Sequence, residues 1–109
     1  MVPSLRLVPT AVAVCLCIAP RSSSAQDIGD AASGLALARQ VCAECHAVDK
    51  QQARSPDPAS PRFEAIANVP GMTSIALTAA LLTSHRSMPN LILDSQQRRN
   101  VVTYILSLK

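Results

Sequence analysis

The stretch VCAECHAVD, residues 41–49, places two cysteines three positions apart, with a histidine directly after the second. This C-x-x-C-H arrangement is the pattern of a covalent c-type haem attachment site. Residues three apart on a helix lie on one face, so Cys42 and Cys45 can both reach the vinyl groups of a flat porphyrin. His46 then points toward the centre of the ring, where its imidazole can bind the iron. The sequence therefore predicts one covalently bound haem.

Two other uses of paired cysteines fit the surrounding sequence less well. A thioredoxin-like redox pair needs a strand–helix context with a βαβ pattern, and the chain has no alternating strand pattern of any length. A closed zinc site needs four ligands, and the second half of the chain offers only His85. A disulfide between Cys42 and Cys45 would close a very short loop and would constrain the chain little. Both redox and zinc sites remain as alternatives to haem.

The composition favours a small domain whose centre is filled by something other than side chains. The chain has 109 residues, which allows one domain. Its two aromatic residues are Phe63 and Tyr104, so it would have difficulty building a sufficient core alone. The formal net charge of +3 is not concentrated in a block, and nucleic-acid binding is not predicted.

Residues 1–25 have the three-part pattern of a secretory signal peptide. A start containing one arginine is followed by the almost wholly apolar run LVPTAVAVCLCIAP and then by RSSSAQD. The run is shorter than the ~20 residues that span a bilayer. Small residues at Ser23 and Ala25 suggest cleavage before Gln26, which leaves residues 26–109 as an exported, periplasmic domain without a stable membrane anchor. An uncleaved anchor is the alternative.

The remaining chain is predicted to be all-α. The proline-rich segment 47–62 cannot be regular helix. Thr73 and Asp94 are expected to cap two helices, and Gln97 completes a box-like start after Asp94. The spacing of apolar residues predicts four helical segments: 27–46, 62–69, 73–85 and 94–109.

Apolar residues mark one face in the third and in the last of these helical segments. In the third segment, Ile75, Ala79 and Leu82 form an apolar stripe, which is expected to face the core. In the last segment, one face is formed by apolar and aromatic residues, namely Val101, Tyr104, Ile105 and Leu108.

A haem iron bound by one histidine needs a ligand on its other side, and the candidates are Met72, His85 and Met88. Met72 follows Pro-Gly at a helix start and suits a gap-filling role in the core. Met88 precedes Pro89, which favours an extended conformation. It lies between two predicted helices, where a loop can pass over a flat ligand. Met88 is the predicted ligand, and His85 is the alternative.

The sequence resembles the small class I c-type cytochromes of bacteria. The likeness rests on the C-x-x-C-H motif, on SHRSMPN with Met88, and on the closing VVTYILSL. Gly34 and Tyr104 match the residues where the first and last helices cross in that family. Pro61 resembles the proline whose carbonyl accepts a hydrogen bond from the haem-binding histidine. Ala38 is a departure, because many relatives carry a large aromatic residue there.

The resemblance implies a cytochrome c-like fold of three to five helices around one haem c, with the first and last helices crossing. It implies single-electron transfer in the periplasm between a redox protein donor and acceptor, by a monomeric carrier that is not an enzyme. Cys42 and Cys45 would attach the haem, and His46 and Met88 would bind the iron. The ring would be buried by apolar side chains, among them Ile66, Leu77, Leu81 and Leu91.

Other functions remain open within the same family. The chain could instead be the cytochrome subunit of a periplasmic dehydrogenase complex. It could also be a haem sensor or catalyst whose sixth ligand is displaced.

Overall fold

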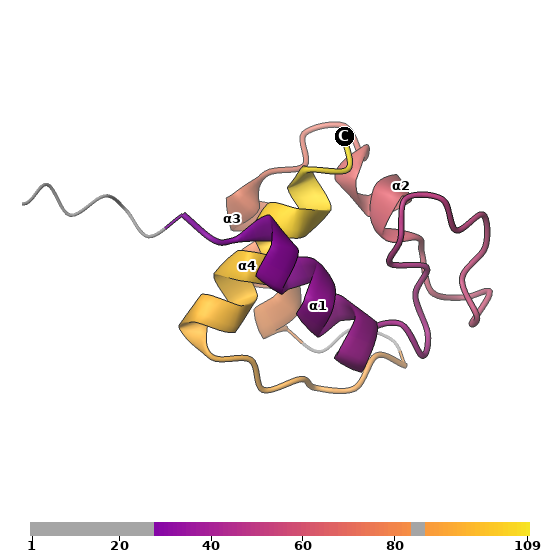
Figure 1. The fold of residues 1–109 in the computed structure, drawn as a ribbon, viewed down its shortest axis with the longest axis horizontal. Helices are drawn as coiled ribbons and strands as arrows, with labels where there is room; N and C mark the ends of the chain where they lie inside the picture. Colours follow the sequence, from indigo (N-terminus) through magenta and orange to yellow (C-terminus); the bar gives the residue numbers. More distant parts are fainter. Residues whose placement is uncertain (1–27, 84–86) are drawn as a thin grey trace, which may run out of the picture.

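A computed structural model of the chain describes residues 28–83 and 87–109. The predicted signal peptide, residues 1–25, and the candidate ligand His85 lie outside the described residues. The described chain forms four helices and no strand, which confirms the all-α prediction. Figure 1 shows the helices α1 (Ala31–Val41), α2 (Phe63–Ala67), α3 (Ser74–Leu82) and α4 (Ser95–Leu106). Within residues 28–83 and 87–109, none of these helices has the length and apolar character needed to cross a membrane.

Helix α1 is shorter than the predicted segment 27–46. It begins after Asp30, whose carboxylate accepts a hydrogen bond from the Ser33 amide at 2.8 Å. It ends before Cys42, and the Ala43 amide bonds back to the Ala38 carbonyl at 3.0 Å, as at many helix ends. The C-x-x-C-H motif therefore lies in the turns that follow α1.

Helices α3 and α4 begin at the predicted caps, Thr73 and Asp94. The Thr73 side chain accepts a hydrogen bond from the Ala76 amide at 3.2 Å. The Asp94 carboxylate accepts from the Gln97 amide at 2.8 Å, and the Gln97 side chain accepts from the Asp94 amide at 3.0 Å. This reciprocal pair is a complete capping box. As predicted, segment 47–62 contains no regular helix, and it forms a large loop on one side of the molecule (right in Figure 1).

The predicted inward face of α3 is wrong. Ile75 is 80% exposed and Leu82 is 60% exposed, whereas Leu77 is buried. Leu81 packs partly buried against the same core as Leu77. Because α3 is apolar on nearly all sides, the spacing of its apolar residues could not show which face is covered.

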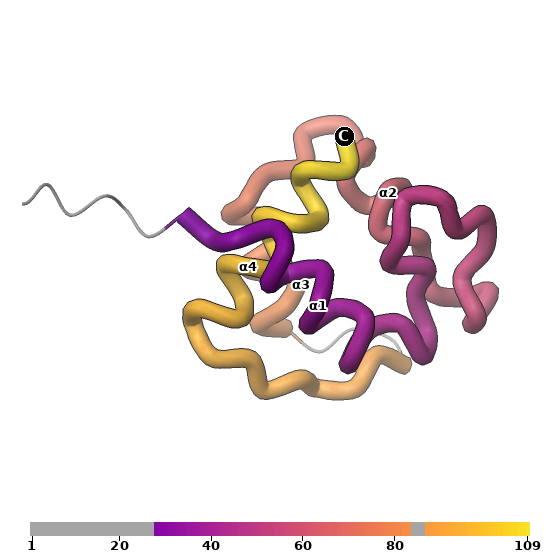
Figure 2. The backbone as a smooth tube through the Cα atoms, in the orientation of Figure 1, coloured from indigo at the N-terminus to yellow at the C-terminus, as the bar shows by residue number. Residues whose placement is uncertain are grey.

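Helices α1 and α4 cross at the centre of the fold (Figures 1 and 2). At Gly34 the backbones come so close that a Cβ atom would collide with the Asn100 carbonyl oxygen and crowd Tyr104. Ala38, where many relatives carry an aromatic residue, is completely buried in the same core. The small side chains of α1 thus allow the close helix crossing that the resemblance implied.

The inward face of α4 is the one predicted, because Val101, Tyr104, Ile105 and Leu108 are all buried. The Tyr104 hydroxyl donates a hydrogen bond to the Val48 carbonyl at 2.5 Å, which fixes the chain just after the C-x-x-C-H motif. The C-terminal end of the chain lies beside the turn after α2 (Figure 2). There Lys109 donates to the Met72 carbonyl at 2.9 Å.

Replacing Gly34 with alanine should lower the free energy of unfolding by about 2 kcal/mol, because the added methyl group forces α1 away from α4. Helix propensity alone would change it by about 1 kcal/mol in the opposite direction. Urea denaturation of the haem-containing protein measures the difference. Ala36→Gly, at an exposed position of α1, is the control for propensity. A Gly34→Ala protein as stable as the wild type would contradict the close crossing.

Candidate cofactor site

A cavity of about 500 Å³ lies between the end of α1, helices α3 and α4, and the loop that precedes α4. This volume is in the range of cofactor-binding pockets. All four predicted site residues line it: Cys42, Cys45, His46 and Met88. Most of its other lining residues are apolar, among them the four expected to bury a haem, Ile66, Leu77, Leu81 and Leu91.

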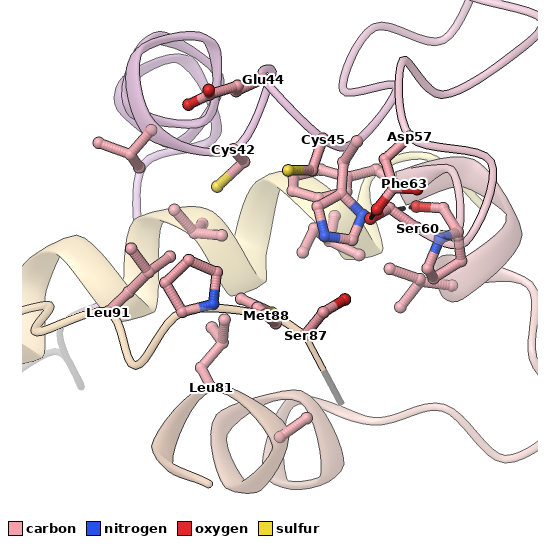
Figure 3. Close-up of a pocket in the computed structure, with 18 of the residues that line it drawn as sticks. Cys42, Glu44, Cys45, Asp57, Ser60, Phe63, Leu81, Ser87, Met88 and Leu91 are labelled. Carbon is pink, nitrogen blue, oxygen red and sulfur yellow. Dashed lines mark hydrogen bonds between the residues drawn. The ribbon is translucent and has the colours of Figure 1, made fainter. Parts of the chain in front are cut away.

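Cys42 and Cys45 lie on one wall of the cavity, with both sulfur atoms directed into it (Figure 3). The turn that carries them is tight, because the Cys45 and His46 amides both bond to the Cys42 carbonyl, at 3.2 and 2.9 Å. Cys42 is buried, and burial raises the pKa of its thiol to about 11. The two thiols form no disulfide with each other. They are thus placed to react with one planar group in the cavity.

His46 has a fixed orientation. Its Nδ1 lies 2.7 Å from the Pro61 carbonyl oxygen, which can only accept a hydrogen bond, so Nδ1 carries the proton. This tautomer leaves Nε2 with a free lone pair for a metal ion. The Phe63 ring lies against the imidazole, with 5.5 Å between centroids and a tilt of 51°. The contact between His46 and Pro61 is the one that the family resemblance implied.

The loop that delivers Pro61 is held by Asp57. The Asp57 amide donates to the Cys45 carbonyl at 3.1 Å. The Asp57 carboxylate accepts from the Ala59 amide and the Ser60 hydroxyl, both at 2.9 Å. The hydrogen bond from the Ala59 amide is the largest cause that lowers the pKa of Asp57, and the bond from the Ser60 hydroxyl lowers it further. The nearby His46 also lowers this pKa. Sequence reasoning missed Asp57, because an aspartate in a proline-rich loop signals only a turn.

The two methionine candidates occupy different places. Met88 lines the cavity from the loop before α4, on the side away from Cys42 and Cys45 (Figure 3). Met72 is not among the described residues that line the cavity, and its partly buried side chain packs against the core. This is the gap-filling position expected for Met72. The third candidate, His85, lies outside the described residues.

These residues fit a haem held by two thioether bonds. The two thiols share one wall of the cavity, and an imidazole with a free Nε2 lies beside them. Met88 lines the cavity on the other side. The lining between them is apolar, as a porphyrin face requires. Imidazole and thioether are the axial ligands found in cytochromes c.

Comparison with known proteins agrees with this chemistry. Residues 31–109 match the family described as Cytochrome c. The chain belongs to the cytochrome c family. It is 37% identical over 98 residues to a protein named cytochrome c-552 from Bradyrhizobium diazoefficiens, an alignment that covers 88% of this chain and 92% of the relative. No solved structure matches the chain with significant similarity.

Membership of the family confirms the resemblance seen in the sequence. The protein has a cytochrome c fold and carries covalently attached haem c. Its role is haem-based electron transfer, as a carrier rather than an enzyme.

Replacing Phe63 with leucine should lower the free energy of unfolding by about 1.5 kcal/mol, because its ring packs between the rings of His46 and Tyr104. Chemical denaturation of the haem-containing protein measures this loss. Val69→Ala, at a position 48% exposed, is the control and should change stability by less than about 0.5 kcal/mol. Equal losses in the two variants would show that the ring contacts of Phe63 contribute little.

Proposed function

We propose that the protein is a periplasmic single-electron carrier whose one haem c is attached through Cys42 and Cys45. In this proposal His46 and Met88 would bind the iron. The observation that carries it is the cavity, which brings an oriented imidazole, two thiols and a methionine from separate segments to one apolar space.

When bound, the haem supplies an iron centre that gains and loses one electron. With both His46 and Met88 bound to the iron, no position would be left for a substrate, and this favours a carrier over a catalyst. The Met88 thioether stabilises the reduced state and raises the potential. The apolar lining, with Leu77 and Leu81, keeps water from the iron. The Pro61 carbonyl holds the His46 imidazole in its ligating orientation.

Export is proposed from the sequence of residues 1–25, which has the pattern of a secretory signal peptide. The mature domain would then be residues 26–109, which contain all four proposed site residues. Covalent haem attachment and removal of the signal peptide can be checked together.

The mass of the protein purified from the periplasm should equal that of residues 26–109 plus one haem, because both cysteines form thioether bonds and the chain is cut before Gln26. Intact-protein mass spectrometry measures this. The double variant Cys42→Ala, Cys45→Ala should lose the covalent haem. A membrane-bound protein that retains Met1 would contradict export, and a double variant with covalent haem would contradict the attachment site.

Met88→Ala should abolish the weak red absorption band of methionine sulfur on ferric iron and lower the reduction potential. It should also let the reduced protein bind carbon monoxide, because a coordination position opens. Absorption spectroscopy and a redox titration measure these changes. Met72→Ala is the matched control, since Met72 packs against the core, and its spectrum and potential should stay as in the wild type. His85→Ala should also leave both unchanged.

Two results would overturn this assignment. Loss of the sixth ligand in His85→Ala would indicate a haem bound by two histidines, with a lower potential. Rapid carbon monoxide binding by the wild type would indicate a sensor or catalyst with a displaceable ligand.

A separate result bears on the carrier role. Purification of the protein together with a larger dehydrogenase would indicate a subunit rather than a free carrier.

A further inference from the structure

Among the described residues that line the cavity, the charged ones are both acidic: Glu44 and Asp57. Glu44 is exposed, and it makes no hydrogen bond or ion pair with any described residue. Asp57 is half-buried, and two hydrogen bonds fix its carboxylate. Asp57 therefore holds its charge at a defined place beside the cavity, whereas Glu44 is free to turn toward water.

Asp57 also connects the two segments that meet at His46. Its amide donates a hydrogen bond to the Cys45 carbonyl in the attachment turn, which is the turn that carries Cys42 and Cys45. Its carboxylate holds Ser60, directly before Pro61, whose carbonyl accepts the bond from His46 Nδ1. The three links form a closed loop of contacts from Cys45 through Asp57 and Pro61 to His46. Loss of the carboxylate would release the acceptor of the histidine.

Within residues 28–83 and 87–109, Asp57 makes no ion pair with a lysine or arginine. The described ion pairs join Arg39 to Asp49 and Arg62 to Glu64, and neither includes Asp57. A fixed negative charge near a cavity of low polarity acts more strongly than one in water. It favours the oxidised iron, which carries one more positive charge. A hydrogen bond from Nδ1 makes the imidazole a stronger donor, which favours the same state.

We propose that Asp57 is a positioning residue that lowers the reduction potential of the haem, both through its fixed charge and by holding Pro61 against His46. This rests on the proposed attachment and ligation of the haem. The apolar lining and Met88 raise the potential, and Asp57 opposes them. No bond forms or breaks in this role, and one electron is exchanged with the redox partner of the carrier.

The test is a redox titration of haem-containing Asp57→Asn, which keeps the shape of the side chain and removes its charge. Its potential should rise, so that at one ambient potential a larger fraction of the protein is reduced than in the wild type. Asp57→Glu should restore most of the wild-type potential. Glu64→Gln is the matched control, since it removes one negative charge that does not line the cavity, and its potential should not change.

If Asp57→Asn does not fold, as judged by circular dichroism, Ser60→Ala takes its place. It removes the bond that holds the carboxylate but leaves the charge, so a smaller rise in potential is expected. An unchanged potential in the folded variant would overturn the proposal, as would an equal rise in Glu64→Gln. Failure of the proposed ligation would appear separately, as a wild type without covalent haem or without the red absorption band.

Discussion

The close approach of α1 to α4 at Gly34 is the constraint on which the rest of the structure depends. Because Gly34 has no side chain, the backbones of the two helices can meet there, and the end of α1 is brought over the middle of α4. Cys42 then shares a cavity with Val101 and Ile105 of α4. A larger residue at position 34 would separate the helices, and the attachment turn would no longer lie above this apolar wall.

The same arrangement leaves the protein with a modest core. Among the described residues, the largest fully buried side chains are Val48 and Val101. Phe63 lines the cavity, and the Tyr104 ring packs against Phe63. A domain of this size gains limited stability from such side chains alone. The haem therefore serves as much as a structural element as a redox centre, since its faces replace the missing apolar side chains.

The sequence was most informative where a residue has a specific chemical role. The capping box at Asp94 and the inward face of α4 could both be predicted, because spacing and side-chain type specify them. The inward face of α3 could not be predicted, since a helix that is apolar on nearly all sides carries no directional signal. Asp57 was missed for another reason, because its importance comes from contacts across the loop and not from a local motif.

The contacts that close the fold join residues far apart in the sequence. The Asp30 amide bonds to the Asn100 side chain across 70 positions, and Tyr104 bonds to Val48 across 56. Such contacts form late and slowly, because the entropy of closing a long loop must first be overcome. Until α4 has docked, α1 has no helix to pack against. The turn that carries Cys42 and Cys45 therefore stays accessible until then, so the chain can meet its haem before it takes its final shape.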